Sequence, residues 1–191
     1  MAKLTLARAR ELLQKHVAEK HLLLHALAVS AAMGAMAELF HEDRDHWEAV
    51  GYLHDVDFEK YPGEHLGHVH ELLSGEGVDD ADIRAILSHG YGHCGDVEPQ
   101  VNLEKSLFTV DELTGIVMAA ALMRPGGISD LEVKSVMKKF KDKRFAAKCD
   151  RDLILNGCER LSLPLETVVE RVIEGMRRYM DELGLGPKAE A

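Results

Sequence analysis

Apolar residues recur at intervals of three and four along most of the chain, which is the spacing of one buried face of an α-helix. Long stretches follow this period rather than the alternation that marks a half-buried strand. The residue types agree with this, because aromatic residues make up only 5% of the chain while Ala, Leu, Met, Glu and Lys abound. We therefore expect an all-α fold, a single-domain helical bundle.

The period predicts helices over 4–17, 20–40, 47–54, 69–73, 80–89 and 103–123. A capping box, Ser129-Asp-Leu-Glu132, predicts the start of a further helix, and Pro164 begins a long last one. A polar break over 41–45 separates the second helix from the third. His41 and His46 flank this break, and we expect both to be solvated.

The chain length sets the domain organisation. With 191 residues the chain can build one sizeable core, but it is too short for two ordinary domains. We expect one helical domain over 1–186, with a core that carries the motifs over 20–123 and a helical extension over 128–186. The residues after it, 187–191, are expected to form a disordered tail.

Charge and cysteine content narrow the partners and the location. A formal net charge of −10 argues against general binding to nucleic acid, although bound cations would still allow a small phosphorylated substrate. Three cysteines without metal-type spacing indicate reduced thiols. Because we find neither a charged leader nor an apolar run of membrane-spanning length, we expect a cytoplasmic protein with no membrane contact.

A histidine and an aspartate stand side by side at the end of an apolar run, as His54 and Asp55. Neighbouring helical positions point in different directions, so both can face one pocket only near a helix end, and Pro62-Gly63 supplies a turn shortly afterwards. His65 and His68 follow at once, and His89 comes after the next apolar segment. Neutral imidazoles and carboxylates together suit divalent metals, so this stretch indicates a metal site built from several helices.

Two further polar residues occupy positions that should face the core. His25 lies within the apolar stripe of the second predicted helix, and Asp111 fills the missing stripe position between Leu107 and Thr114. Burying an unpaired carboxylate costs several kcal/mol. A buried salt bridge to Lys or Arg would satisfy Asp111, and a rotated helix would expose it instead. A shared metal would satisfy every one of these inward residues together.

The ordered set of motifs resembles the HD superfamily of metal-dependent phosphohydrolases, which is named after the His-Asp dipeptide. The similar stretches are His25-Ala-Leu-Ala-Val, Gly51-Tyr-Leu-His-Asp, Ala85-Ile-Leu-Ser-His89 and Leu107-Phe-Thr-Val-Asp111, within roughly 20–123. The resemblance implies an HD-type helical bundle. It also implies one divalent metal ion, held by His25, His54, Asp55 and Asp111.

Some HD proteins bind a second metal ion through two more histidines. The candidates here are His89 and His65, with His68 as the rival of His65, and Asp55 would then bridge the two ions. One or two ions are expected, and Fe, Mn, Mg, Zn and Ni all suit such ligands. The branch that cleaves cyclic dinucleotides is not indicated, because the proline of its signature and the glycine-lysine pair after the dipeptide are both missing.

The C-terminal third contains a basic segment over 134–151, with eight basic residues against two acidic ones. Such a segment could be a wall that recruits phosphate beside the metal, or simply a solvated surface. Lys141, Lys143 and Arg144 fall in a predicted loop and are our candidates for contact with the substrate.

The resemblance and the ligand types together predict an enzyme that hydrolyses a phosphate monoester or diester of a nucleotide or another small metabolite through metal-activated water. Asp55 would hold metal and nucleophile, and His68 or a lysine of the basic segment would protonate the leaving group. Two alternatives are a di-iron oxygenase with the same ligands and a non-catalytic, nucleotide-binding regulatory module. We expect a monomer or a homodimer.

Overall fold

The computed structural model describes residues 3–188, and within them the chain is all-helical, as predicted. Its α-helices in chain order are α1 (Leu6–Gln14), α2 (Lys20–Leu39), α3 (Arg44–Leu53), α4 (Val69–Leu73), α5 (Asp80–Ser88), α6 (Asn102–Leu122), α7 (Val133–Lys141), α8 (Arg151–Leu161) and α9 (Leu165–Arg178). A short 3₁₀ turn, η1 (Pro62–Glu64), precedes α4. Within the described residues no strand forms, and the pairing of Tyr91 with Gly95 is an isolated bridge.

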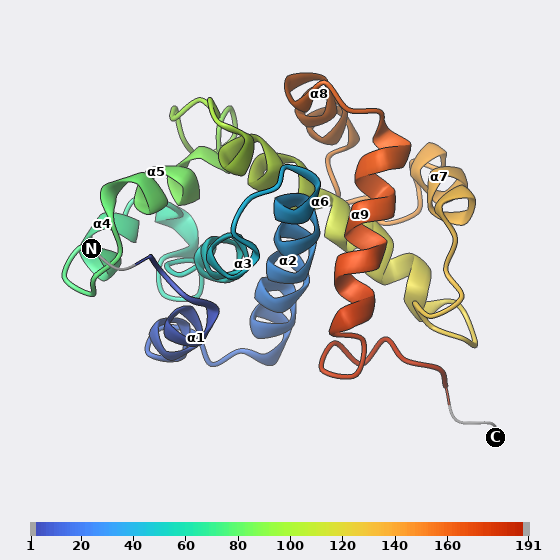
Figure 1. The fold of residues 1–191 in the computed structure, drawn as a ribbon, viewed down its shortest axis with the longest axis horizontal. Coiled ribbons are helices and arrows are strands. Elements are labelled where there is room, and N and C mark those ends of the chain that lie inside the picture. Colours follow the sequence, from blue (N-terminus) through green and yellow to red (C-terminus); the bar gives the residue numbers. More distant parts are fainter. Residues whose placement is uncertain (1–2, 189–191) are drawn as a thin grey trace.

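Helix α2 is the central element of the bundle. It packs against α3, α6 and α9, and Figure 1 shows it near the middle of the molecule, between α3 and α9. Every residue over 26–37 is buried, which is a wider surface than the single stripe that the sequence predicts. Small residues account for the difference, because alanines, Ser30 and Gly34 let neighbouring helices approach from several sides.

Helix α2 is also long and apolar enough to cross a membrane by length and composition, with a mean hydropathy of 1.7. The expectation that no apolar run reaches that length is therefore wrong for this helix. Core helices of soluble proteins pass the same test, and 67% of this apolar window is buried inside the protein. The composition of α2 therefore matches its place in the core.

The C-terminal extension packs onto the long helices of the motif-bearing core. Helices α7 and α8 contact α6, and α9 crosses α2 so closely that a Cβ added at Gly175 would collide with the backbone carbonyl of Ala31. Similarly, a Cβ at Gly157 of α8 would collide with the side chain of Thr109 in α6. The extension and the core therefore share one set of helix contacts.

Two local expectations about the extension need correction. The helix predicted to begin at the capping box begins instead at Val133, and the Ser129 hydroxyl bonds to the Gly126 carbonyl in the preceding turn. In the predicted tail, the Lys188 N–H donates to the Pro125 carbonyl at 2.8 Å, so the described start of that tail is held at the end of α6. Residues 189–191 lie outside the described residues.

His46 does not lie in solvent, contrary to expectation. Its Nε2 is 2.7 Å from Oδ1 of Asp82, a buried carboxylate of α5. The Asp43 side chain caps α3, which places His46 in the first turn of that helix, facing α5. The hydrogen bond to Asp82 raises the pKa of His46 above its ordinary value. This contact ties α3 to α5, the helix that ends at His89.

Candidate metal centre

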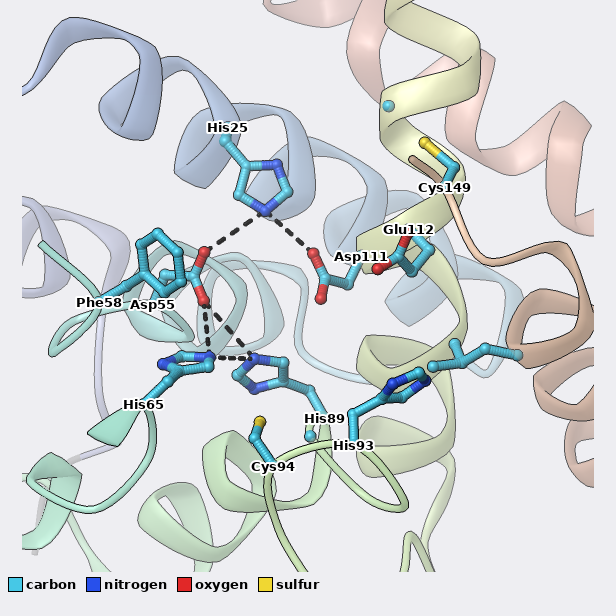
Figure 2. A pocket seen from close by; sticks show the side chains of 13 residues that line it. His25, Asp55, Phe58, His65, His89, His93, Cys94, Asp111, Glu112 and Cys149 are labelled. Carbon is cyan, nitrogen blue, oxygen red and sulfur yellow. Dashed lines mark hydrogen bonds and ion pairs between the residues drawn. The ribbon is translucent and has the colours of Figure 1, made fainter. Parts of the chain in front are cut away.

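Six side chains from five parts of the fold converge on one site. His25 comes from the second turn of α2, His54 caps the C-terminus of α3 with Asp55 next to it, and Asp111 lies in the middle of α6. The remaining two are His65, which follows η1, and His89, which caps the C-terminus of α5. Figure 2 shows five of the six side chains pointing toward one another across a cavity of about 300 Å³.

The first group of ligand atoms surrounds one point. His25 Nε2 lies 3.0 Å from Asp111 Oδ1 and 3.1 Å from His54 Nε2, and 3.6 Å from Asp55 Oδ2. His54 Nε2 lies 3.3 Å from Asp55 Oδ2 and 3.4 Å from Asp111 Oδ1. Ligands bound about 2.0–2.1 Å from one tetrahedral metal ion lie about 3.3 Å apart. The distances around His25 and His54 are close to this value, so these side chains could hold a divalent ion.

The second group lies on the other side of Asp55. His65 Nε2 is 3.2 Å from His89 Nε2, and the two nitrogens are 3.3 and 3.5 Å from Asp55 Oδ1. Asp55 thus turns one carboxylate oxygen to each group of ligands. Three His/Asp sets each have ligand atoms within 4.8 Å of one another: His25, His54 and Asp55; Asp55, His65 and His89; and a third set of His54, His89 and Asp111, which takes one histidine from each group.

The outer nitrogens of three imidazoles have hydrogen-bond partners. His54 Nδ1 is 2.8 Å from the Gly51 carbonyl and His89 Nδ1 is 2.6 Å from the Ile86 carbonyl, so each donates to its own helix three residues back. His65 Nδ1 lies 2.9 Å from Oδ1 of Asp57. A neutral imidazole with its proton on Nδ1 leaves a lone pair on Nε2. In each case Nε2 is the atom that faces the ligand group, as metal coordination requires.

The charges of the site depend on one another. Burial alone lowers the pKa of His54, but the charges of Asp55 and Asp111 outweigh it and raise this pKa well above 6.5. Burial likewise opposes the rise of the His65 pKa to about 9, which hydrogen bonds to Asp55 and Asp57 cause. Against the effect of burial, the histidines hold the pKa values of both ligand aspartates well below their usual range. The carboxylates are thus ionised and need positive charge beside them.

Asp57 supports the second group and was not predicted from the sequence. It is fully buried, accepts from His65 Nδ1 through Oδ1, and accepts the His68 backbone N–H through Oδ2 at 3.2 Å. Its spacing of two residues from Asp55 gives the only hint of this role. Recognising it requires the path of the turn after α3, which a periodic pattern does not supply.

His68 is not brought into the cavity. Its ring stacks on Tyr61 with the ring centroids 3.7 Å apart, and its two nitrogens lie 2.7 Å from Glu64 and 3.2 Å from Glu71. These carboxylates hold the imidazole on the outside of the turn, and they raise its pKa. Of the two rivals for the second ligand group, His65 is therefore the one that reaches Asp55.

The basic segment does not line the cavity either. Lys141, Lys143 and Arg144 are exposed, and the Arg144 side chain bonds only to Asp142 within the described residues. Arg151 has an internal role, because its guanidinium donates to six backbone carbonyls of the segment 139–149. The loop after α7 thus folds around one arginine, and its other cations point outward.

The remaining cavity wall contains residues that the sequence did not single out as functional. Phe58 meets His65 edge to face, and the other such residues are Gly90, His93, Cys94, Glu112, Gly115, Cys149 and Leu153. Burial raises the pKa of the Cys149 thiol to about 11 and also raises that of Cys94. Both thiols are therefore protonated near neutral pH.

No family model matches the chain, and no curated protein or solved structure matches it either. Any assignment of function therefore rests on the six convergent side chains. Their donor set, four imidazoles and two carboxylates around a shared aspartate, could hold divalent metal ions.

Proposed function

We propose that the protein is a metal-dependent phosphohydrolase of the HD type, which cleaves a phosphate monoester or diester of a nucleotide or another small metabolite. One observation carries the proposal: the two oxygens of Asp55 face two separate groups of histidine ligands, so that this carboxylate can bridge two ions. Two-metal sites of this kind are used for hydrolysis of phosphate esters.

Each ligand would have a distinct role in binding the ions. Divalent ions, when bound, lower the pKa of water and polarise a phosphoryl oxygen. His25, His54 and Asp111 would hold one ion and His65 and His89 the other, each through the nitrogen or oxygen that faces Asp55. The two oxygens of Asp55 would keep the ions at a fixed separation. Because core helices carry His25 and Asp111 and His54 ends another, this part of the site is set before substrate enters and needs little reorganisation during the reaction.

The leaving oxygen needs a proton from a group within the cavity. His68 and the lysines of the basic segment do not line the cavity. Another residue must therefore protonate the leaving group. We assign the proton to His93, an imidazole of the wall that belongs to neither ligand group. Its Nε2 lies 3.3 Å from Oδ2 of Asp150, so a carboxylate is in place to orient the ring.

The deciding experiment measures metal content per chain together with phosphate release from a broad panel of phosphate esters. Wild-type protein, Asp111→Ala and His89→Ala are compared, with His70→Ala as the matched control because His70 is exposed and outside the cavity. We expect about two ions in wild type and about one in His89→Ala, with phosphate release lost in both ligand variants and kept in the control.

Three outcomes would overturn the proposal. The first is full activity after either ligand substitution. The second is uptake of dioxygen by an iron-loaded protein that changes redox state, which is the behaviour of a di-iron oxygenase. The third is tight nucleotide binding by the metal-loaded protein without turnover of any ester, which is the behaviour of a regulatory module.

A further inference from the structure

The cavity beside the ligand groups has no basic wall. None of the thirteen residues that line it, all within the described part of the chain, is a lysine or an arginine. The wall does contain a carboxylate, Glu112, which belongs to neither ligand group. Apart from the ligand groups, the ionisable wall residues that a bound molecule meets include the carboxylate of Glu112 and the imidazole of His93, with no lysine or arginine.

Glu112 has one carboxylate oxygen to spare. It follows Asp111 on α6, and its Oε2 accepts the backbone N–H of Asp150 at 3.0 Å. Oε1 has no hydrogen-bond partner among residues 3–188, and it is not sealed from solvent. In Figure 2 the carboxylate lies beside Asp111, on the side away from His65. The bond to Asp150 thus fixes the side chain while Oε1 stays open to the cavity.

The surroundings hold this carboxylate in place. Asp150 caps α8 by accepting the Leu153 N–H at 3.0 Å, so the donor to Glu112 is anchored at a helix start. Gly115, one turn along α6, leaves room for Cys149, because a Cβ there would lie 2.8 Å from the thiol sulfur. The loop that carries Asp150 therefore sits directly against α6, and its backbone amide holds one oxygen of Glu112.

We propose that Glu112 is the specificity-determining residue of this site, and that it accepts a hydrogen bond from a hydroxyl or ammonium group on the part of the substrate remote from the phosphoryl group. This inference rests on the proposed phosphohydrolase function and narrows its substrate class. Esters of amino alcohols and polyols, ribose monophosphates among them, would be favoured. Substrates with a second phosphate or a carboxylate at that position would meet the Glu112 charge without a lysine or arginine in the wall to offset it.

A structural role alone does not account for the residue. The bond to the Asp150 N–H uses only one oxygen, and a glutamine could make that bond through its amide oxygen. A site that accepts from a hydroxyl or ammonium group discriminates against analogues that lack the donor, because such an analogue excludes water from the carboxylate oxygen without replacing its hydrogen bond. The substitution Glu112→Gln therefore separates the two roles.

The test uses phosphate esters that differ at one position, namely propyl, 2-hydroxyethyl and 2-aminoethyl phosphate, together with carboxymethyl phosphate. With the metal-loaded enzyme we expect kcat/KM for the hydroxyl and ammonium esters to exceed that for the propyl ester by about tenfold or more, and the carboxylate ester to be poorest. In Glu112→Gln the preference for ammonium should fall about tenfold or more, while the preference for hydroxyl persists.

A binding measurement makes the result independent of turnover. The Asp150 amide donates to Glu112, so its NMR resonance should move when the zinc-loaded protein is titrated with 2-aminoethyl phosphate, and should move much less with propyl phosphate. The matched control is Glu98→Gln, which removes an exposed carboxylate that pairs with Arg160 outside the cavity. We expect it to leave all ratios unchanged.

The outcomes separate the two proposals. If propyl phosphate is hydrolysed as well as the other esters, or if Glu112→Gln leaves the ratios unchanged, the assignment of Glu112 is wrong while the phosphohydrolase stands. If no ester is hydrolysed but the Asp150 resonance responds selectively to the ammonium probe, the phosphohydrolase is wrong and the recognition by Glu112 stands.

Discussion

The two ligand groups share Asp55, yet the protein holds them in different ways. His25, His54 and Asp111 are attached to α2, α3 and α6, and α2 packs directly on both of the other helices. His65 and His89 lie in or next to irregular chain. His65 precedes Leu66, whose φ of 71° lies in the left-handed region, and His89 precedes a glycine-containing loop.

This difference teaches that one site can combine a preformed part with an adjustable part. In the first group, His54 is completely buried at the end of α3 and Asp111 lies in the middle of α6, so core helices hold both ligands in place. Each histidine of the second group is held by one outer hydrogen bond, to Asp57 or to the Ile86 carbonyl. We therefore expect the first group to bind its ion more tightly than the second.

The largest effect should follow from Asp55→Asn, which removes the charge that the two groups share while it keeps the side-chain volume. Both ions should be lost, and phosphate release should fall by at least about a thousandfold. Elemental analysis and turnover measure the two effects, and circular dichroism checks that the helices remain. Retention of one full ion by this variant would show that the groups do not depend on the shared carboxylate.

Stepwise chelation should reveal the difference between the groups directly. Titration of the loaded wild-type protein with a chelator should remove the ions in two separate steps, because the second group is less rigidly held. In His89→Ala only the later, tighter step should remain. Removal of both ions from wild type in one step would show that the two groups bind their ions equally tightly.

The substitution Asp57→Asn should weaken the second ligand group and leave the first group unchanged. The amide introduced by this substitution has one acceptor oxygen in place of two, so it can serve only one of the two N–H donors that Asp57 now satisfies, and the orientation of His65 is weakened. Loss of such an outer partner costs about 10–100-fold in metal affinity. We expect a loss in that range for the second ion alone, measured by competition with a chelating dye. An equal loss for the first ion would mean that Asp57 acts on the whole site.

The helical period predicted the fold class, and the resemblance implied the full ligand set, but His25 and Asp111 were marked as inward residues for one physical reason. His25 and Asp111 interrupt apolar stripes of long helices, and a polar residue in such a stripe has to be buried with a partner. The burial of Asp57 and Glu112 could not be predicted in this way. Asp57 lies in a turn, and Glu112 faces a loop that arrives from α8, so no periodic pattern marks either residue.

The basic segment shows the opposite case. A run of like charge indicates that a segment is solvated or lies near a counter-ion. It does not indicate which part of the fold lies beside that segment. The structure places its candidate cations on the outside, and Arg151, which is the member with an internal role, was not distinguishable from the other seven by pattern.

A smaller effect should be visible in stability. The pKa of His46 is raised in the folded protein by Asp82, so the pair stabilises the fold fully below the ordinary histidine pKa of 6.5 and loses this contribution as pH rises through the raised value. His46→Gln should thus cost about 1 kcal/mol in mildly acid solution and less in alkaline solution. Urea unfolding at several pH values measures it. A cost that does not change with pH would mean that the ring packs without its charge.

The smallest effect is expected from replacing Lys141, Lys143 and Arg144 together by alanine. Because these side chains are exposed and do not line the cavity, kcat/KM should change by no more than about twofold at moderate salt. A large drop would show that the basic segment reaches substrate in a way that the cavity wall does not reveal.

The close approaches at Gly175 and Gly157 bear on whether part of this protein could serve as a separate domain. Helix α9 touches the backbone of α2, and α8 touches Thr109, two residues before Asp111. Helices that approach this closely need a glycine at the point of contact, so an unrelated helix in either place would need the same small residue there. The stretch over 20–123, although it carries all six ligands, is therefore not a portable module, and it can be transferred between proteins only together with the helices that follow it.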